Sequence, residues 1–125
     1  MNSFNVSLWI SSTHQPGRTA FEGVEAGLSN SPHTWVSAYV LQAAGVQREK
    51  KISFVRDGHA VTRDVGFALI SYPPSFRTVD EVVFAEPGDR LVLGDRTLKG
   101  FNAKVDPDQE ELVAAGPILA AGNVK

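Results

Sequence analysis

The chain has 125 residues, of which 42% are hydrophobic and 21% charged, and these values predict one folded domain and exclude an intrinsically disordered chain. The formal net charge of -2 argues against a surface that is dedicated as a whole to nucleic-acid phosphates. There is no cysteine, which excludes disulfides, thiolate catalysis and cysteine-containing metal sites.

The first residues and the hydropathy of the chain favour a cytoplasmic product. Residues 1–6 contain neither a basic region nor a long apolar run, so they do not resemble a secretory signal. No window approaches the roughly 18 apolar residues that a membrane-spanning helix needs. We therefore expect a protein that is made and used in the cytoplasm and has no membrane partner.

The first predicted element is a strand from Phe4 to Ile10. A period of two places four apolar side chains on one of its faces. The polar run at 11–18 contains a Pro-Gly step and predicts an exposed loop. The strand should therefore form an early wall of the core.

The stretch from Thr19 to Leu41 gives weaker signals. Thr19 to Leu28 combines helically spaced apolar residues with two glycines, each of which costs about 1 kcal/mol in a helix interior, so a short strand or an irregular segment stays open beside a helix. A second loop is predicted at 29–33. Beyond it, aromatic and β-branched residues favour a strand from Trp35 to Leu41, and a helix capped by Thr34 is the alternative.

The clearest predicted element is a hairpin, residues 48–64, centred on Asp57-Gly58. A two-residue turn of this type adopts positive φ at both positions and matches the twist of the flanking strands, so it fixes the register. Cross-strand pairs of apolar residues and of opposite charges then fall opposite each other, which supports the prediction. The predicted pairs are Arg56 with His59, Phe54 with Val61, Ile52 with Arg63, and Lys51 with Asp64.

The rest of the chain is predicted to be a series of strands and turns. The return strand of the hairpin continues to Ser71 and ends at Pro73-Pro74, because proline cannot donate to a strand ladder. It is long enough that its distal half should pair with another strand. Further strands are expected at Val79 to Phe84, Arg90 to Leu93, Arg96 to Val105 and Leu112 to Ala115, with turns at Pro87-Gly88-Asp89, Gly94-Asp95 and the acidic run 106–111.

Frequent turns and the lack of a convincing long helix predict an all-β fold, a small β-barrel or sandwich with long loops. We expect a single domain over residues 1–125 with its core at roughly 4–115. The hairpin 48–64 should project from this core. The small, weakly apolar tail at 116–125 should become ordered only against a partner.

No cluster of residues predicts an active site. The three histidines, His14, His33 and His59, lack the close spacing of a metal site and are interpreted as surface residues. The acidic run at 106–111 lacks the glycine and the ligand alternation of a calcium loop. We therefore expect no catalytic residue, no cofactor and no metal, and a protein that is not an enzyme.

One local excess of charge supports a functional hypothesis. It consists of the basic residues of the hairpin: Arg48, Lys50, Lys51, Arg56, His59 and Arg63. A charged edge strand that resists edge-to-edge pairing is one explanation. Contact with a polyanion or an acidic partner surface is the other, and such contact would weaken steeply with salt.

The order of signals from Arg48 to Asp106 resembles the small head-completion, or stopper, proteins of tailed bacteriophages. A polar, basic approach leads through the Asp-Gly hairpin into a strand, and a proline step, a Gly-Asp-Arg strand start and a final hairpin follow. The most specific piece runs from Pro87 to Leu93. The likeness covers about half of the chain and does not extend to the serine-rich segment 11–42.

The resemblance implies a small β-barrel that forms a homo-oligomeric ring in the virion neck, beneath the portal and adaptor, where it retains packaged DNA and accepts the tail. It implies portal, adaptor and tail proteins as partners, and a virion location after assembly in the host cytoplasm. The basic hairpin would then face the DNA channel. Another phage structural subunit, such as a tail-terminator, tail-tube or capsid-decorating protein, stays open, as does a small β-barrel ligand-binding module.

Overall fold

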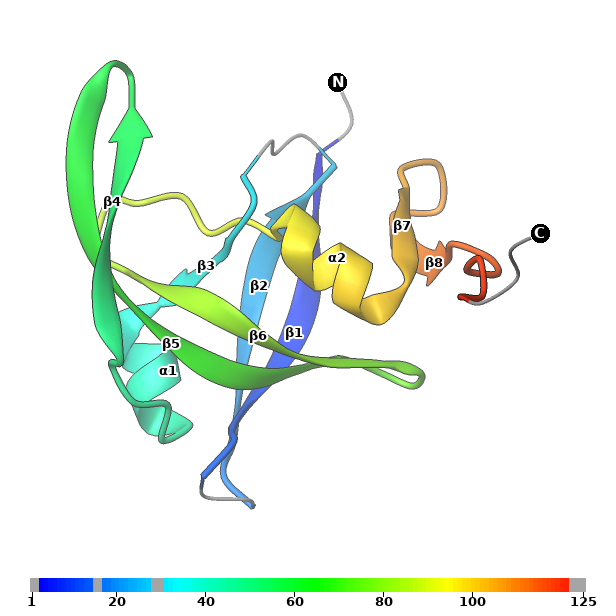
Figure 1. Cartoon of the computed structure of the whole chain (residues 1–125), viewed down its shortest axis with the longest axis horizontal. Helices are drawn as coiled ribbons and strands as arrows, with labels where there is room; N and C mark the ends of the chain where they lie inside the picture. Colours follow the sequence, from blue (N-terminus) through cyan, green and yellow to red (C-terminus); the bar gives the residue numbers. More distant parts are fainter. Residues whose placement is uncertain (1–2, 15–16, 28–30, 122–125) are drawn as a thin grey trace.

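The protein is built on a six-stranded mixed sheet, with a separate two-stranded hairpin near its carboxyl end. The computed structural model describes residues 3–14, 17–27 and 31–121. Residues 15–16 and 28–30 of the predicted loops and residues 122–125 of the predicted tail lie outside the described residues. The body is mostly β, with 54% strand and 11% helix. The strands are β1 (Phe4–Ser12), β2 (Thr19–Ala26), β3 (Thr34–Ser37), β4 (Lys50–Arg56), β5 (His59–Tyr72), β6 (Phe76–Ala85), β7 (Ala103–Asp106) and β8 (Glu111–Ala114), and the helices are α1 (Ala38–Ala43) and α2 (Asp95–Phe101) (Figure 1).

The long strand β5 organises the sheet. The strand order is β2-β1-β5-β6-β3, and β4 pairs with the first half of β5. The distal half of β5 pairs with β1 on one side and with β6 on the other, which confirms that it has partners outside its own hairpin. Every pair in this sheet is antiparallel except β3 with β6, which run parallel.

The expected all-β barrel or sandwich is confirmed only as a mostly β fold, because the mixed sheet is not closed into a barrel. β2 and β3 are the two ends of the sheet, and the segment 91–93 runs between them. The Trp35 amide of β3 donates to the Val92 carbonyl (3.0 Å), and on the other side the Glu25 amide of β2 donates to the Leu91 carbonyl (2.8 Å). The predicted strand from Arg90 to Leu93 makes only the single bridge Glu25–Val92, because the turn before it and helix α2 after it leave no length for a ladder.

One face of the sheet carries the main core. Leu8 and Ile10 of β1 and Ile70 of β5 are fully buried there. Helix α1 covers this face with Leu41, and helix α2 covers it with Phe101. The two helices therefore lie on the same side of the sheet, and the alternation in β1 that predicted a core wall is confirmed.

The amino-terminal third differs from the predictions in one element. The strand predicted from Phe4 is confirmed and continues to Ser12, and the weak segment after the loop is the strand β2. The strand expected from Trp35 to Leu41 ends at Ser37, where α1 begins. Glu22 of β2 causes this change: its carboxylate accepts hydrogen bonds from the backbone amide (3.1 Å) and the hydroxyl of Ser37 and so holds the start of the helix.

The hairpin is confirmed in every predicted pair. Asp57 and Gly58 have φ values of 52° and 78°, as the two-residue turn requires. The observed partners are Arg56 with His59, Phe54 with Val61, Ile52 with Arg63, and Lys51 with Asp64. Figure 1 shows this ribbon curling away from the rest of the sheet and extending beyond it.

The strand predicted from Arg96 to Val105 is wrong. Residues Asp95–Phe101 form α2, Asn102 ends the helix in the left-handed conformation with φ 54°, and only Ala103–Asp106 is strand. A Cβ at Gly100 would lie 2.2 Å from Oγ1 of Thr78 on β6, so glycine allows the helix to lie directly on the sheet. This contact with the distant strand β6 decides that the segment is a helix.

The predicted acidic turn is confirmed, since β7 and β8 pair around it. The short strand that was predicted after this turn is β8.

Candidate functional site

The six basic residues of the hairpin separate into three groups instead of forming one patch. The first group surrounds Asp64. Lys51 Nζ lies 2.7 Å from Oδ1 of Asp64, and Arg48 Nη1 lies 2.5 Å from Oδ2. The hydrogen bonds from these two side chains, Lys51 first, lower the pKa of the Asp64 carboxyl. The predicted cross-strand pair of opposite charges is therefore confirmed, with Arg48 added to it.

The second group ties the hairpin to the turn 86–89. Arg63 donates to both carboxylate oxygens of Asp89, from Nε to Oδ2 (2.7 Å) and from Nη2 to Oδ1 (2.9 Å). Arg56 donates to Oδ1 from both terminal nitrogens, at 3.0 Å each. The Glu86 backbone amide also donates to Oδ2 (2.8 Å). We call Arg56, Arg63 and Asp89 the Asp89 clamp.

The Asp89 carboxylate is strongly stabilised in its charged form. Its side chain is only 3% exposed. The hydrogen bonds from Arg63 are the main cause that lowers its pKa from 3.8 to about 2, with smaller contributions from the Glu86 amide and Arg56. The clamp therefore links both strands of the hairpin to the turn 86–89 through a charged carboxylate.

The third group contains the remaining candidates. Lys50 Nζ lies 3.4 Å from Oε2 of Glu81 on β6. His59, the first residue of β5, is exposed, and it has no ion pair among the residues that the structure describes. Five of the six candidates thus have an acidic partner within the chain. This pairing, together with the position of β4 outside β5 in the sheet, agrees with a charged edge strand.

One histidine lies in a polar network that the sequence did not reveal. The expectation that His33 is a surface residue is wrong: its Nε2 lies 2.9 Å from Oε1 of the buried Glu81, and its side chain is 13% exposed. This hydrogen bond is the main cause that lowers the Glu81 pKa. Arg96 of α2 joins the network, 3.5 Å from Glu81 and 3.3 Å from Asp80. The network connects β6, α2 and the start of β3.

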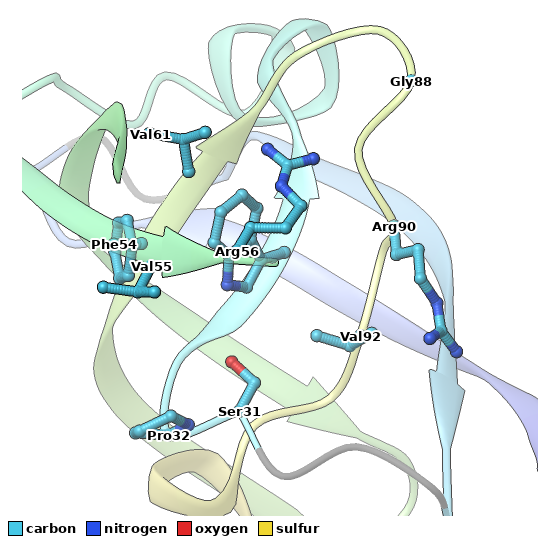
Figure 2. A pocket seen from close by; sticks show the side chains of 10 residues that line it. Ser31, Pro32, Phe54, Val55, Arg56, Val61, Gly88, Arg90 and Val92 are labelled. Carbon is cyan, nitrogen blue, oxygen red and sulfur yellow. The ribbon is translucent and has the colours of Figure 1, made fainter. Parts of the chain in front are cut away.

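A groove opens where the hairpin curls back toward β3 and the segment 86–93. Its volume is about 580 Å³. The Phe54 ring lies against the Trp35 ring, with centroids 5.1 Å apart. Figure 2 shows the hairpin residues Phe54, Val55, Arg56 and Val61 on one side and Arg90 and Val92 on the other. We call this space the hairpin groove; its further lining residues are Ser31, Pro32, Trp35 and Gly88.

Exposed apolar side chains also lie on the outer face of the sheet. Trp9 of β1 and Phe21 of β2 are cross-strand partners whose rings meet edge to face, with centroids 4.9 Å apart. Phe67 of β5 and Val79 of β6 are exposed as well. The register places these four residues on one face. The sequence signal for this strip was Trp9, which occupies an outward position in the alternation of β1.

The described segments contain no cluster of three or more residues able to hold a metal ion. In the same part of the chain, no helix has the length and apolar character needed to cross a membrane.

Comparisons with known proteins gave no relative. No protein-family model matches the sequence, and neither a curated protein nor a solved structure is significantly similar to the chain. The resemblance to phage head-completion proteins therefore rests on the residues quoted above and stays a prediction.

Proposed function

We propose that this chain is a structural subunit of a bacteriophage neck, a head-completion or stopper protein that assembles into a homo-oligomeric ring and is not an enzyme. The observation that carries the proposal is the projecting hairpin. It extends beyond the body (Figure 1), and its tip carries Val55, which is 81% exposed. A ribbon that leaves the body in this way suits insertion between neighbouring subunits or into a channel.

The Asp89 clamp supports a mechanical role for the hairpin. An isolated two-stranded ribbon is only marginally stable in water, so its position needs support from elsewhere in the fold. Arg56 and Arg63 supply this support through a carboxylate that is almost completely buried. The ribbon is therefore held at a defined angle, as a channel-lining or subunit-locking element requires.

The ion pairs of the hairpin are compatible with contact to DNA. Arg48 and Lys51 are exposed, and exposed ion pairs contribute only about 0–1 kcal/mol. Phosphate groups at high local concentration would compete with Asp64 for these two cations. Such contacts would be directed to the backbone of the DNA and would weaken with salt.

The proposal is tested by reconstitution with the portal complex of the same virus. We expect electron microscopy to show the chain as a ring seated on the portal. A chain that stays monomeric and binds no neck component would contradict the proposal. Density for the chain at the end of the tail tube or on the capsid surface would instead favour a tail or capsid-decorating subunit.

The role of the basic hairpin is tested separately with matched sets of substitutions. Arg48→Gln, Lys50→Gln and Lys51→Gln remove three exposed positive charges and leave the Asp89 clamp intact. The control set, Arg77→Gln, Lys99→Gln and Lys104→Gln, removes the same charge from β6, α2 and β7. We expect only the first set to weaken DNA binding by the assembled ring, measured as a reduced salt dependence of affinity. Equal effects from both sets would show that the hairpin has no special role.

The hairpin groove favours one second candidate, a ligand-binding module, because its volume lies within the roughly 300–1,000 Å³ of small-molecule pockets. Its two arginines, however, already bind carboxylates of the chain, Arg56 to Asp89 and Arg90 to Glu25. Native mass spectrometry distinguishes the candidates. A stoichiometric small-molecule adduct on the purified protein would favour the module, and its absence together with a ring mass would favour the neck subunit.

A further inference from the structure

We propose that residues 117–121 of one copy of the chain bind in the hairpin groove of the next copy. This inference rests on the proposed function, because it names the contact that joins neighbouring subunits of the ring. Its partner is thus a second copy of this chain, and the recognised chemistry is a short apolar segment next to a cluster of carboxylates.

The segment 117–121 has the character of an unpaired binding element. Its sequence is Pro-Ile-Leu-Ala-Ala, and it follows β8 without forming a helix or strand. Ile118 is 74% exposed and Leu119 is 91% exposed. Two large aliphatic side chains in water at the end of a β-hairpin are energetically unfavourable, and transfer of both into an apolar groove would remove this cost.

The hairpin groove offers a matching surface. Trp35, Phe54, Val61 and Val92 provide aromatic and aliphatic walls. Its volume of about 580 Å³ has room for more than one aliphatic side chain. The Phe54 ring also lies edge to face with His33, with centroids 5.5 Å apart, so both aromatic walls are positioned by neighbours.

The charges next to the two surfaces are complementary. Asp108, Glu110 and Glu111 lie in or beside the β7–β8 turn, close in sequence to the segment 117–121, and they form no ion pair within the described part of the chain. Arg56 and Arg90 lie at the groove, and both are exposed. A guanidinium has five N–H donors, so each arginine retains donors beyond its internal carboxylate.

The positions of the two surfaces determine the kind of assembly. Figure 1 shows β8 on one side of the body and the hairpin with β3 on the other, so the segment does not reach the groove of its own chain. Contact between two different surfaces is heterologous. Repeated contacts of this kind produce a ring where the rotation closes.

The first test measures assembly with variants of each surface. Ile118→Ser with Leu119→Ser removes the aliphatic side chains, and Val61→Glu places a carboxylate in the groove. Pro32→Glu provides a second groove variant at an exposed position. The control, Phe21→Ser with Val79→Ser, removes two exposed apolar residues from the outer face of the sheet. We expect sedimentation velocity to show monomers for the tail and groove variants and the wild-type assembly for the control.

A mixture of tail and groove variants gives the sharpest result. The tail variant keeps an intact groove, and the groove variant keeps an intact tail, so one productive contact remains between them. We expect the equimolar mixture to form a heterodimer and nothing larger, whereas each variant alone stays monomeric. A wild-type assembly from the tail variant, or a mixture that stays monomeric, would overturn the inference.

A peptide separates this inference from the proposed function. A synthetic peptide of residues 114–121 is added to the tail variant that also carries Trp9→Phe, in which the groove is not filled by a neighbouring tail and Trp35 is the only remaining tryptophan. We expect a saturable change in Trp35 fluorescence, and an affinity at least about tenfold lower for the peptide with both serines. A portal-bound ring without peptide binding would overturn the inference and leave the neck proposal intact. Peptide binding by a chain that binds no neck component would support the inference and contradict the neck proposal.

Discussion

The projecting hairpin and the segment around α2 are stabilised in different ways. The hairpin derives its register from the Asp57-Gly58 turn and from pairing between its own two strands. Helix α2 is held by contacts with distant strands: Thr97 donates to Asp80 of β6 (2.9 Å), and its hydroxyl lies 2.6 Å from that of Thr34 on β3. The register of the hairpin is thus locally specified, and the hairpin contacts the body through the Asp89 clamp, the Lys50–Glu81 pair and the Phe54 ring, whereas α2 depends on distant contacts.

This difference bears on assembly. An element that forms its own pairs keeps its register where it extends from the body, and its position is supported by the Asp89 clamp, the Lys50–Glu81 pair and the contact of Phe54 with Trp35. An element that depends on distant contacts has to stay within the body. The element that we assign to partner contact is therefore the one whose structure depends least on the core.

The largest effect is expected where α2 meets β6. Gly100→Val should destabilise the protein by about 3 kcal/mol, because its side chain would overlap Thr78 and force the helix away from the sheet. Gly23→Val on β2 is the matched control, since nothing lies within 4 Å of a Cβ there. Chemical denaturation measures both. Equal stability of the two variants would show that α2 does not depend on this contact.

The next effect is expected at the Asp89 clamp. Asp89→Asn should destabilise the protein at pH 7 by about 2 kcal/mol, because the charged form is favoured by a pKa of about 2 instead of 3.8. The stabilisation is complete above pH 3.8 and is lost as the pH falls through about 2. Denaturation between pH 4 and 2 should therefore show a steeper loss for the wild type than for Asp89→Asn. Parallel pH profiles would contradict the assigned role of this carboxylate.

A smaller effect is expected at the turn of the hairpin. Gly58→Ala should cost about 1–2 kcal/mol of local stability, because φ there is 78° and L residues with a Cβ are strained in this region. Hydrogen exchange should become faster in β4 and in the paired half of β5 and stay unchanged in β1 and α2. An equal increase in all strands would show that the hairpin and the body unfold as one unit.

The smallest effect is expected at the exposed Lys51–Asp64 pair. Lys51→Gln should change the free energy of unfolding by less than about 1 kcal/mol, because the ammonium is exposed and the pair is screened by salt. Thermal unfolding at low and high salt measures this effect. A loss as large as that of Asp89→Asn would contradict the distinction between the exposed pair and the buried clamp.

The pairing of the hairpin strands was predicted correctly from the sequence, because a two-residue turn fixes the register of the two strands that it joins. The α2 segment carried local signals too, with Asp95 in the first turn, Lys99 in the last turn and Asn102 as a left-handed cap. These signals competed with the Gly94-Asp95 pair, which also has the chemistry of a hairpin turn. Contact with Thr78 and Asp80 decided between them, and neither contact is visible in the local sequence.

The candidate site was predictable only where local sequence determines it. The basic residues were found by composition, and the Lys51–Asp64 pair followed from the register. The acidic partners Glu81 and Asp89 come from β6 and from the turn beyond it, so only the fold shows that they neutralise the hairpin. The groove was not predicted, because it depends on the curl that brings Phe54 onto Trp35.

The mass of the wild-type chain in solution with its portal complex tests the central claim most directly. A subunit of a neck ring should add to the portal complex one closed ring whose own mass is a fixed integer multiple of 13.5 kDa. A single species of 13.5 kDa at every concentration, with or without the portal, would contradict the account.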